Sequence, residues 1–259
     1  MKIATIDIGT NTILLLVATV GQSGNIVTLA YEQRIPRLGR GVDAYMNLQP
    51  ESMHRAIDVM KEYENIIEAH QPDSVVVAAT SAVRDAANRN EFSNLLRVNT
   101  GFELEVLSGD DEAYWTYRGA ISGIANIGHA TVVDIGGGST EITVGDRVSI
   151  HNRISLGIGS VRVTERFFKN DPPTHPELEA AITFVEDELA RPKGFGFSGS
   201  TLIGVAGTAT SLAMLDQELK EFSVSAVTGY RMKLDNVYSL FRMLREMPST
   251  EIRKLSEVM

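Results

Sequence analysis

Two acidic residues and three consecutive glycines lie close together in the stretch VVDIGGGSTE, residues 132–141. Asp134 ends an apolar run that reads as a strand, and a loop without bulky side chains lets the backbone approach a ligand closely. The loop consists of Gly136, Gly137, Gly138 and Ser139. Its amides can bind phosphate oxygens, and Asp134 and Glu141 can hold a divalent cation directly or through water. The alternative is a glycine turn between two strands that binds nothing.

The same pattern occurs near the start of the chain, in ATIDIGTNT at residues 4–12. Asp7 ends that strand and is a further candidate metal ligand. The turn after it contains Gly9, Thr10 and Asn11. The two copies are separated by about half the chain, which predicts two halves built alike. We expect the two loops to face each other across a central cleft, where ligands preferentially bind.

Two further segments, one basic and one containing glycine, are candidates for phosphate binding. The run RIPRLGRGV, residues 34–42, carries Arg37 and Arg40 and is either a solvated loop or a flexible basic rim that contacts phosphates. A strand at 201–206 leads into Gly207 and Thr208, which form a third phosphate-type turn at the start of a helix. These segments extend the candidate phosphate site beyond the two loops.

Arg84 follows a strand at residues 73–79, DSVVVAA, which reads as buried on both faces and central in its sheet. Ligands gather at the carboxyl end of such a strand. We place Arg84 in the first turn of the next helix, where the macrodipole disfavours a cation unless an anion binds there. Another helix is expected to begin at Ser108, which can cap it together with Asp111, three residues later. Two acids suffice for that helix end, so one acid of the DDE run, residues 110–112, is left without a capping role.

The overall composition limits the class of function. Of the 259 residues, 43% are hydrophobic and 22% are charged, as in an ordinary globular protein. The absence of cysteine excludes disulfides and thiol catalysis, and the net charge of −9 argues against nucleic acid or membrane as partners. The start MKIATIDIG reads as a strand and not as a signal peptide, so we expect a cytoplasmic protein. No Walker, GxSxG or HExxH motif is present.

The paired DIGTNT and DIGGGSTE loops resemble the actin, sugar-kinase and chaperone ATPase superfamily, whose halves are ribonuclease-H-like. The fuller set resembles the exopolyphosphatase / guanosine pentaphosphate phosphohydrolase family and covers nearly the whole chain. In chain order that set is DIGTNT, RxxRLGRGVD, ATSAVRDA, SGDDEA, DIGGGSTE, SLGIGSVRVTE and GVAGTATS. The resemblance implies an α/β fold of two ribonuclease-H-like (actin-like ATPase) domains facing a central cleft.

The resemblance also assigns roles to individual residues. The family's catalytic glutamate falls on Glu112, its phosphate-binding arginine on Arg84, and its metal-associated acids on Asp134 and Glu141. Its phosphate loops fall on residues 9–11, 136–139 and 207–208. Asp111 departs from the glutamate usual there. The expected cofactor is Mg²⁺, with Mn²⁺ as the alternative, because both are hard ions that bind oxygen.

We expect domains at residues 1–124 and 125–259. The family resemblance implies a closing segment of the second half beyond Met259, so we expect this half to be either truncated at its end or a compact variant. The resemblance implies removal of the terminal phosphate of polyphosphate or guanosine pentaphosphate, with Glu112 as general base for water attack. The alternatives are a non-enzymatic sensor of these ligands and an ATP-dependent kinase of the same superfamily. The sequence is compatible with a homodimer.

Overall fold

The computed structural model describes residues 1–22, 24–124 and 127–256. The chain divides into two compact units, Met1–Glu112 and Ala113–Met259, called here the first and the second unit. The boundary expected between residues 124 and 125 involves residue 125, which lies outside the described residues. Helix α5 (Gly109–Ser122) contains residues of both units.

The first unit is built on one mixed sheet with the strand order β3-β2-β1-β4-β5. Its strands are β1 (Lys2–Ile8), β2 (Ile13–Val20), β3 (Ile26–Arg34), β4 (Ser74–Ala79) and β5 (Glu105–Val106). The first three are antiparallel neighbours, whereas β4 runs parallel to β1 and β5 runs parallel to β4. Its helices are α1 (Val42–Tyr45), α2 (Pro50–His70), α3 (Ser81–Asp85) and α4 (Arg89–Thr100).

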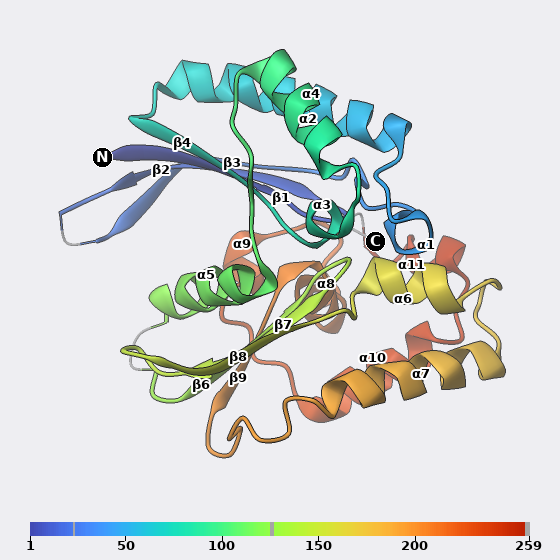
Figure 1. Ribbon diagram of the computed structural model, residues 1–259. Coiled ribbons are helices and arrows are strands. Elements are labelled where there is room, and N and C mark those ends of the chain that lie inside the picture. Colours follow the sequence, from blue (N-terminus) through green and yellow to red (C-terminus); the bar gives the residue numbers. More distant parts are fainter. Residues whose placement is uncertain (23, 125–126, 257–259) are drawn as a thin grey trace. The chain divides into compact units, whose positions relative to one another are not determined.

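Helices α2 and α4 cover one face of this sheet (Figure 1). Alternate residues of β1 and β2 point to that face, as the period of two in a strand requires. Ile6 and Leu15 are buried there against Met60 of α2 and Phe92 of α4. The hydroxyl of the buried Tyr63 donates to the carbonyl of Ile13 over 2.9 Å, which ties α2 to the start of β2.

Strand β4 is less buried than its sequence predicts. It lies between β1 and β5, but Val75 and Val76 are exposed, and only Val77 and Ala79 are fully buried. Val75 lies on the helix-covered face but has no neighbouring strand on one side, because β5 pairs with β4 only at Ala78 and Ala79. Val76 lies on the opposite face, where its partner Thr5 of β1 is also exposed. The first half of β4 therefore forms an edge of the sheet, and the expectation of burial on both faces is wrong there.

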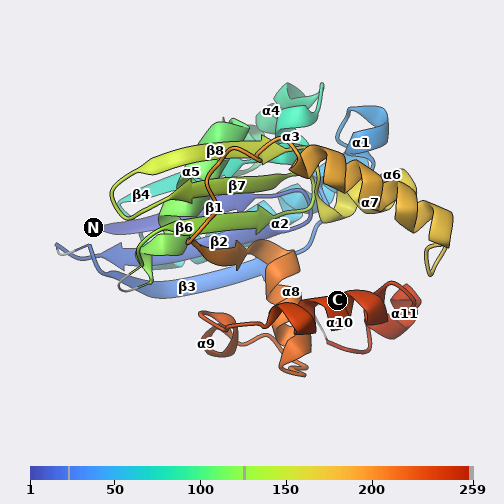
Figure 2. The same cartoon turned by 90° about the horizontal axis from the view of Figure 1, so that it is seen from below.

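The second unit repeats the plan with the strand order β8-β7-β6-β9, and Figure 2 shows its strands β8, β7 and β6 side by side. Its strands are β6 (Ala130–Ile135), β7 (Thr140–Gly145), β8 (Ile150–Leu156) and β9 (Thr201–Val205). Its further helices are α6 (Ser160–Phe167), α7 (His175–Leu189), α8 (Ala206–Asp216), α9 (Val224–Val227), α10 (Leu234–Leu244) and α11 (Ser249–Ile252). Strands β6 to β8 are antiparallel, and β9 runs parallel to β6.

Helices cover both faces of this second sheet. Tyr117 and Ile121 of α5 pack on the face that carries Ala130 and Val132 of β6. On the opposite face, Phe184 and Val185 of α7 pack against Ile142 and Leu156. The face toward α5 also carries Asp134, two residues after Val132 along the same strand.

The two sheets confirm the predicted internal repeat. Each unit has three antiparallel strands and a parallel strand next to the first of them, which confirms the α/β fold class. The central cleft between the halves stays a prediction. Among the described residues, no helix has the length and apolar character needed to cross a membrane.

Candidate active site

In the second unit, the predicted phosphate loop and the predicted helix turn lie at the same edge of the sheet. Strands β6 and β9 are parallel, with Asp134 opposite Val205, so both strands end at that edge. Gly136–Ser139 follows β6 there, and Gly207 and Thr208 lie in the first turn of α8. The structure therefore brings together the two glycine-containing turns that the sequence assigned to this half.

The two candidate metal ligands of this half are direct neighbours. Asp134 on β6 is the cross-strand partner of Glu141 on β7, so their side chains share a face. Thr116 Oγ1 of α5 donates to Asp134 Oδ2 over 3.1 Å, and Ser155 Oγ of β8 donates to Glu141 Oε1 over 2.6 Å. Burial raises the pKa of Asp134, and the bond from Thr116 opposes that shift in part. Two hydroxyls thus orient two shielded carboxylates.

This pair of carboxylates fits a hard cation. Mg²⁺ in phosphoryl-transfer sites uses one or two carboxylates and completes its shell with water and substrate phosphates. Within the described part of the chain, no three His, Asp or Glu side chains are grouped as a ligand set. Asp7, the third candidate ligand, is the last residue but one of β1 in the first unit. Its role as a metal ligand stays a prediction.

The two glycine loops share one backbone arrangement. The amide of Gly9 donates to the carbonyl of Thr12 over 2.9 Å, and the amide of Gly136 donates to the carbonyl of Ser139 over 3.1 Å. In both loops the bond spans three residues and closes the turn between two antiparallel strands. In the described part of the chain, the amides of Gly137 and Gly138 donate to no protein acceptor. Such amides are donors available to an anion.

In the first unit, the equivalent edge gathers the other candidates. Ile8 pairs with Ala79, and the Thr80 amide donates to the Ile8 carbonyl over 3.1 Å, so the turn after β4 lies beside the Gly9–Asn11 loop. Leu107 follows β5 at the same edge, where its amide donates to the carbonyl of Ala79. The starts of α3 and of α5 therefore lie at the end of the sheet that carries the first loop.

The structure brings Arg84 and Glu112 together. Arg84 Nη1 donates to Glu112 Oε2 over 2.7 Å and to the Leu107 carbonyl over 3.2 Å. The two side chains are only 21% and 13% exposed, so solvent replaces this bond poorly. The helix start behind Glu112 is capped as predicted, because Ser108 Oγ accepts the Asp111 amide and donates to its carboxylate. Asp111 is thus the capping acid, and Glu112 is the acid that meets Arg84.

The macrodipole argument for Arg84 is wrong. Helix α3 contains only five residues, and Arg84 lies in its last turn, where a cation is favourable. The local reason for an arginine here is the carboxylate of Glu112.

The segment with Arg37 and Arg40 is not a free rim. The amide of Arg37 donates to the carbonyl of Asn11 over 3.1 Å, and the amide of Gly39 donates to the carbonyl of Thr10 over 2.7 Å. Its backbone is therefore fixed on the first loop, and the intervening Leu38 is fully buried. The side chains of Arg37 and Arg40 are exposed, as contact with a substrate would require.

Sequence reasoning missed the hydroxyls that hold the two carboxylates. Ser155 could have been found from the register of the β7–β8 hairpin, because Ser155 is the residue opposite Glu141 and the two side chains share a face of the sheet. Thr116 carries a weaker signal, because it lies four residues after Glu112 on α5 and its acceptor comes from a different element.

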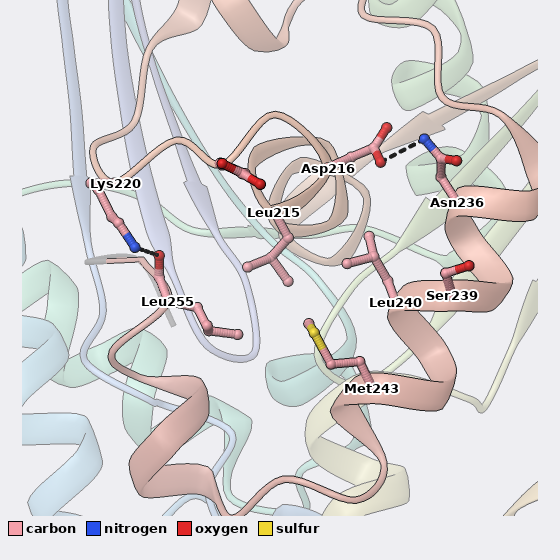
Figure 3. A pocket seen from close by; sticks show the side chains of 9 residues that line it. Leu215, Asp216, Lys220, Asn236, Ser239, Leu240, Met243 and Leu255 are labelled. Atoms are coloured by element: carbon pink, nitrogen blue, oxygen red, sulfur yellow. Dashed lines mark hydrogen bonds between the residues drawn. The ribbon is translucent and has the colours of Figure 1, made fainter.

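A cavity of about 600 Å³ in the second unit lies apart from these residues (Figure 3). It is formed by the end of α8, by α10 and by Leu255 near the described end of the chain. Asp216 beside it accepts bonds from Tyr230 and from Asn236. No residue assigned to the phosphate site from the sequence lines it.

Comparison with known proteins gives a consistent result. The model of the Ppx/GppA phosphatase family matches residues 16–258. Exopolyphosphatase 2 of Mycobacterium tuberculosis is 37% identical over 246 residues, which cover 87% of this chain and 74% of that protein. The guanosine-5'-triphosphate,3'-diphosphate pyrophosphatase of Pseudoalteromonas atlantica is 28% identical over 239 residues, covering 92% of this chain and 46% of that protein.

The fold is shared with solved structures. The crystal structure of the Aquifex aeolicus member of the Ppx/GppA family aligns with a TM-score of 0.81 and 32% identity, over 100% of this chain and 83% of that one. The α/β fold of two similarly built units expected from the sequence is confirmed.

Proposed function

The chain belongs to the Ppx/GppA phosphatase family, and we propose that it removes the terminal phosphate of inorganic polyphosphate or guanosine pentaphosphate. The family resemblance read from the sequence is confirmed. The observation that carries the substrate class is the loop of residues 136–139, next to the carboxylates Asp134 and Glu141. The amides of Gly137 and Gly138 in this loop donate to no acceptor in the described part of the chain. This combination suits a phosphate group with a bound cation.

In the proposed reaction, a water molecule attacks the terminal phosphorus in line with the bridging oxygen, and that P–O bond breaks. Glu112 accepts the proton of the attacking water, a role that typically contributes about 10²–10⁴-fold. Arg84 orients the Glu112 carboxylate through their 2.7 Å bond and neutralises charge on the phosphate. The loop amides bind the equatorial phosphate oxygens, and the exposed Arg37 and Arg40 hold more distal phosphates.

Asp134 and Glu141 would hold Mg²⁺, or Mn²⁺ in its place, which when bound supplies neutralisation of phosphate charge. Thr116 and Ser155 keep these two carboxylates oriented. Asp7 of the first unit stays a predicted metal ligand.

Both relatives named above carry names that describe phosphoanhydride substrates, one polyphosphate and one a guanosine nucleotide. The test is release of orthophosphate from long-chain polyphosphate and, separately, from guanosine pentaphosphate, each with Mg²⁺ and with a chelator. We expect Mg²⁺-dependent release from at least one of them. Binding without release from either would contradict the hydrolase and favour a sensor. Transfer of phosphate from ATP to a sugar would favour a kinase.

A further inference from the structure

The segment between β8 and α6 lies directly behind the glycine loop of the second unit. Three successive carbonyls of that loop accept hydrogen bonds from it. The bonds are Ser160 N–H to Gly136 O (2.9 Å), Val161 and Arg162 N–H to Gly137 O (2.9 and 3.1 Å), and Arg162 Nε to Gly138 O (2.7 Å). We call residues 159–162 the loop clamp.

These bonds fix the direction of the loop amides. In a trans peptide the carbonyl of one residue and the amide of the next point in opposite directions. Because the carbonyls of Gly136, Gly137 and Gly138 point toward the clamp, the amides of Gly137, Gly138 and Ser139 point away from it. In the described part of the chain, none of these three amides donates to a protein acceptor. The clamp thus turns three adjacent donors to one side of the loop.

Gly159 is required by the close approach of the clamp to the loop. A Cβ on Gly159 would lie 2.5 Å from the carbonyl carbon and oxygen of Gly137 and from the nitrogen of Gly138. These are backbone atoms, which cannot rotate aside as a flexible side chain would. The φ of Gly159 is −137°, an ordinary extended value, so contact and not conformation demands glycine here.

The first unit contains a related arrangement, in which the donor segment runs in the opposite direction along the loop. Behind its loop, the amides of Gly39 and Arg37 donate to the carbonyls of Thr10 and Asn11. A Cβ on Gly39 would lie 2.3 Å from the Cγ2 of Thr10, the position that corresponds to Gly137. A glycine packed against the second loop residue therefore belongs to both copies of the repeat.

We propose that Gly159 and Arg162 are positioning residues, which aim the amides of residues 137–139 at a phosphate group. The proposal rests on the proposed function for the identity of its ligand. Neither residue needs to touch the phosphate, since both act through the carbonyls of the loop. Arg162 completes the clamp because the carbonyl of Gly138 receives its bond from the Nε of that side chain.

A glycine pair in the same segment gives a matched test. A Cβ on Gly157 would meet no atom within 4 Å, whereas a Cβ on Gly159 meets the loop. The first amides of a helix have no acceptor within the helix and normally exchange fast. Those of Ser160, Val161 and Arg162 should be protected in the wild type because the loop carbonyls accept them. We expect Gly159→Ala to speed their hydrogen exchange by about tenfold and Gly157→Ala to leave it unchanged.

Arg162→Met keeps the length of the side chain and removes the donor to Gly138, and it serves if Gly159→Ala fails to fold. Its control is Arg166→Met, one turn later in α6, where the guanidinium lies over the ring of Phe184. We expect Arg162→Met to raise the Kd for inorganic phosphate and the KM for polyphosphate by about three- to tenfold, with a smaller change in kcat. Arg166→Met should change neither constant.

Hydrogen exchange and phosphate binding test the clamp independently of substrate hydrolysis. Fast exchange of residues 160–162 in the wild type, or equal Kd values for Arg162→Met and Arg166→Met, would overturn the proposal. If these amides are protected in the wild type but the protein binds no phosphate, the clamp stands as a structural feature and the proposal that its ligand is a phosphate group is overturned. Phosphate binding that weakens in Gly159→Ala and Arg162→Met would support the proposal even if no substrate is hydrolysed, which would contradict only the proposed function.

Discussion

Replacing Arg84 with methionine removes the cation that faces Glu112 and keeps a side chain of similar length. Solvent-exposed ion pairs contribute about 0–1 kcal/mol, and removal of one partner from a fully buried pair costs about 3–5 kcal/mol. The Arg84 and Glu112 side chains are 21% and 13% exposed, and their bond measures 2.7 Å, so this pair lies between these limits. We expect Arg84→Met to lower the free energy of unfolding by about 1–3 kcal/mol.

Urea-induced unfolding of Arg84→Met, Glu112→Gln and the double variant, followed by circular dichroism, measures the coupling. The double variant should lose about 1–2 kcal/mol less than the sum of the single variants, because Arg84→Met then leaves no carboxylate without its cation. The control is Arg34→Met, since Arg34 and Glu62 form a pair of the same type with side chains 38% and 45% exposed. Coupling of zero at Glu112, or a larger loss for Arg34→Met, would refute the reasoning.

Three further changes test other parts of the molecule. Hydrogen bonds from backbone amides lower the pKa of Glu177 to about 2, so its contribution to stability is present above pH 4.5 and is lost as the pH falls toward 2. The difference in Tm between wild type and Glu177→Gln should therefore shrink below pH 4.5, and a difference that stays constant over this range would contradict the reasoning. Asp134→Asn should raise the Mg²⁺ concentration for half-maximal phosphate release by more than about tenfold. It should also raise the Tm of the metal-free protein at neutral pH, because burial disfavours the ionised carboxylate; an unchanged Mg²⁺ requirement would contradict the assignment. Tyr63→Phe should cost about 1 kcal/mol in urea unfolding, because it removes the donor to the buried carbonyl of Ile13, and no loss would show that this bond contributes nothing.

The fold was predictable because the chain repeats a strong local pattern. An apolar strand that ends in Asp-Ile-Gly and turns into a second strand appears twice, and both sheets are built around it. The burial of β4 was not predictable, since its valines look alike in sequence. Val75 is exposed because the short β5 leaves that part of β4 without a neighbouring strand, and Val76 is exposed because it lies on the face opposite α2 and α4.

Candidate site residues that belong to sequence motifs could be predicted, whereas contacts between residues of separate elements could not. The sequence indicates that Arg84 binds an anion, but only the structure shows the Glu112 carboxylate as its partner. The electrostatic argument failed because it assumed a longer helix than the five residues of α3. Thr116 reaches Asp134 from a separate element, and nothing in the spacing of these two residues predicts that contact.

The central claim is that Glu112 activates water on a bound phosphoanhydride. The most direct measurement compares Glu112→Gln with wild type in phosphate release and in equilibrium binding of polyphosphate and guanosine pentaphosphate, with Asp110→Asn as the neighbouring control. Glutamine still offers an oxygen to Arg84, so binding should change by less than about threefold, while release falls by at least about 100-fold. Lost binding with retained turnover in Glu112→Gln would contradict the account.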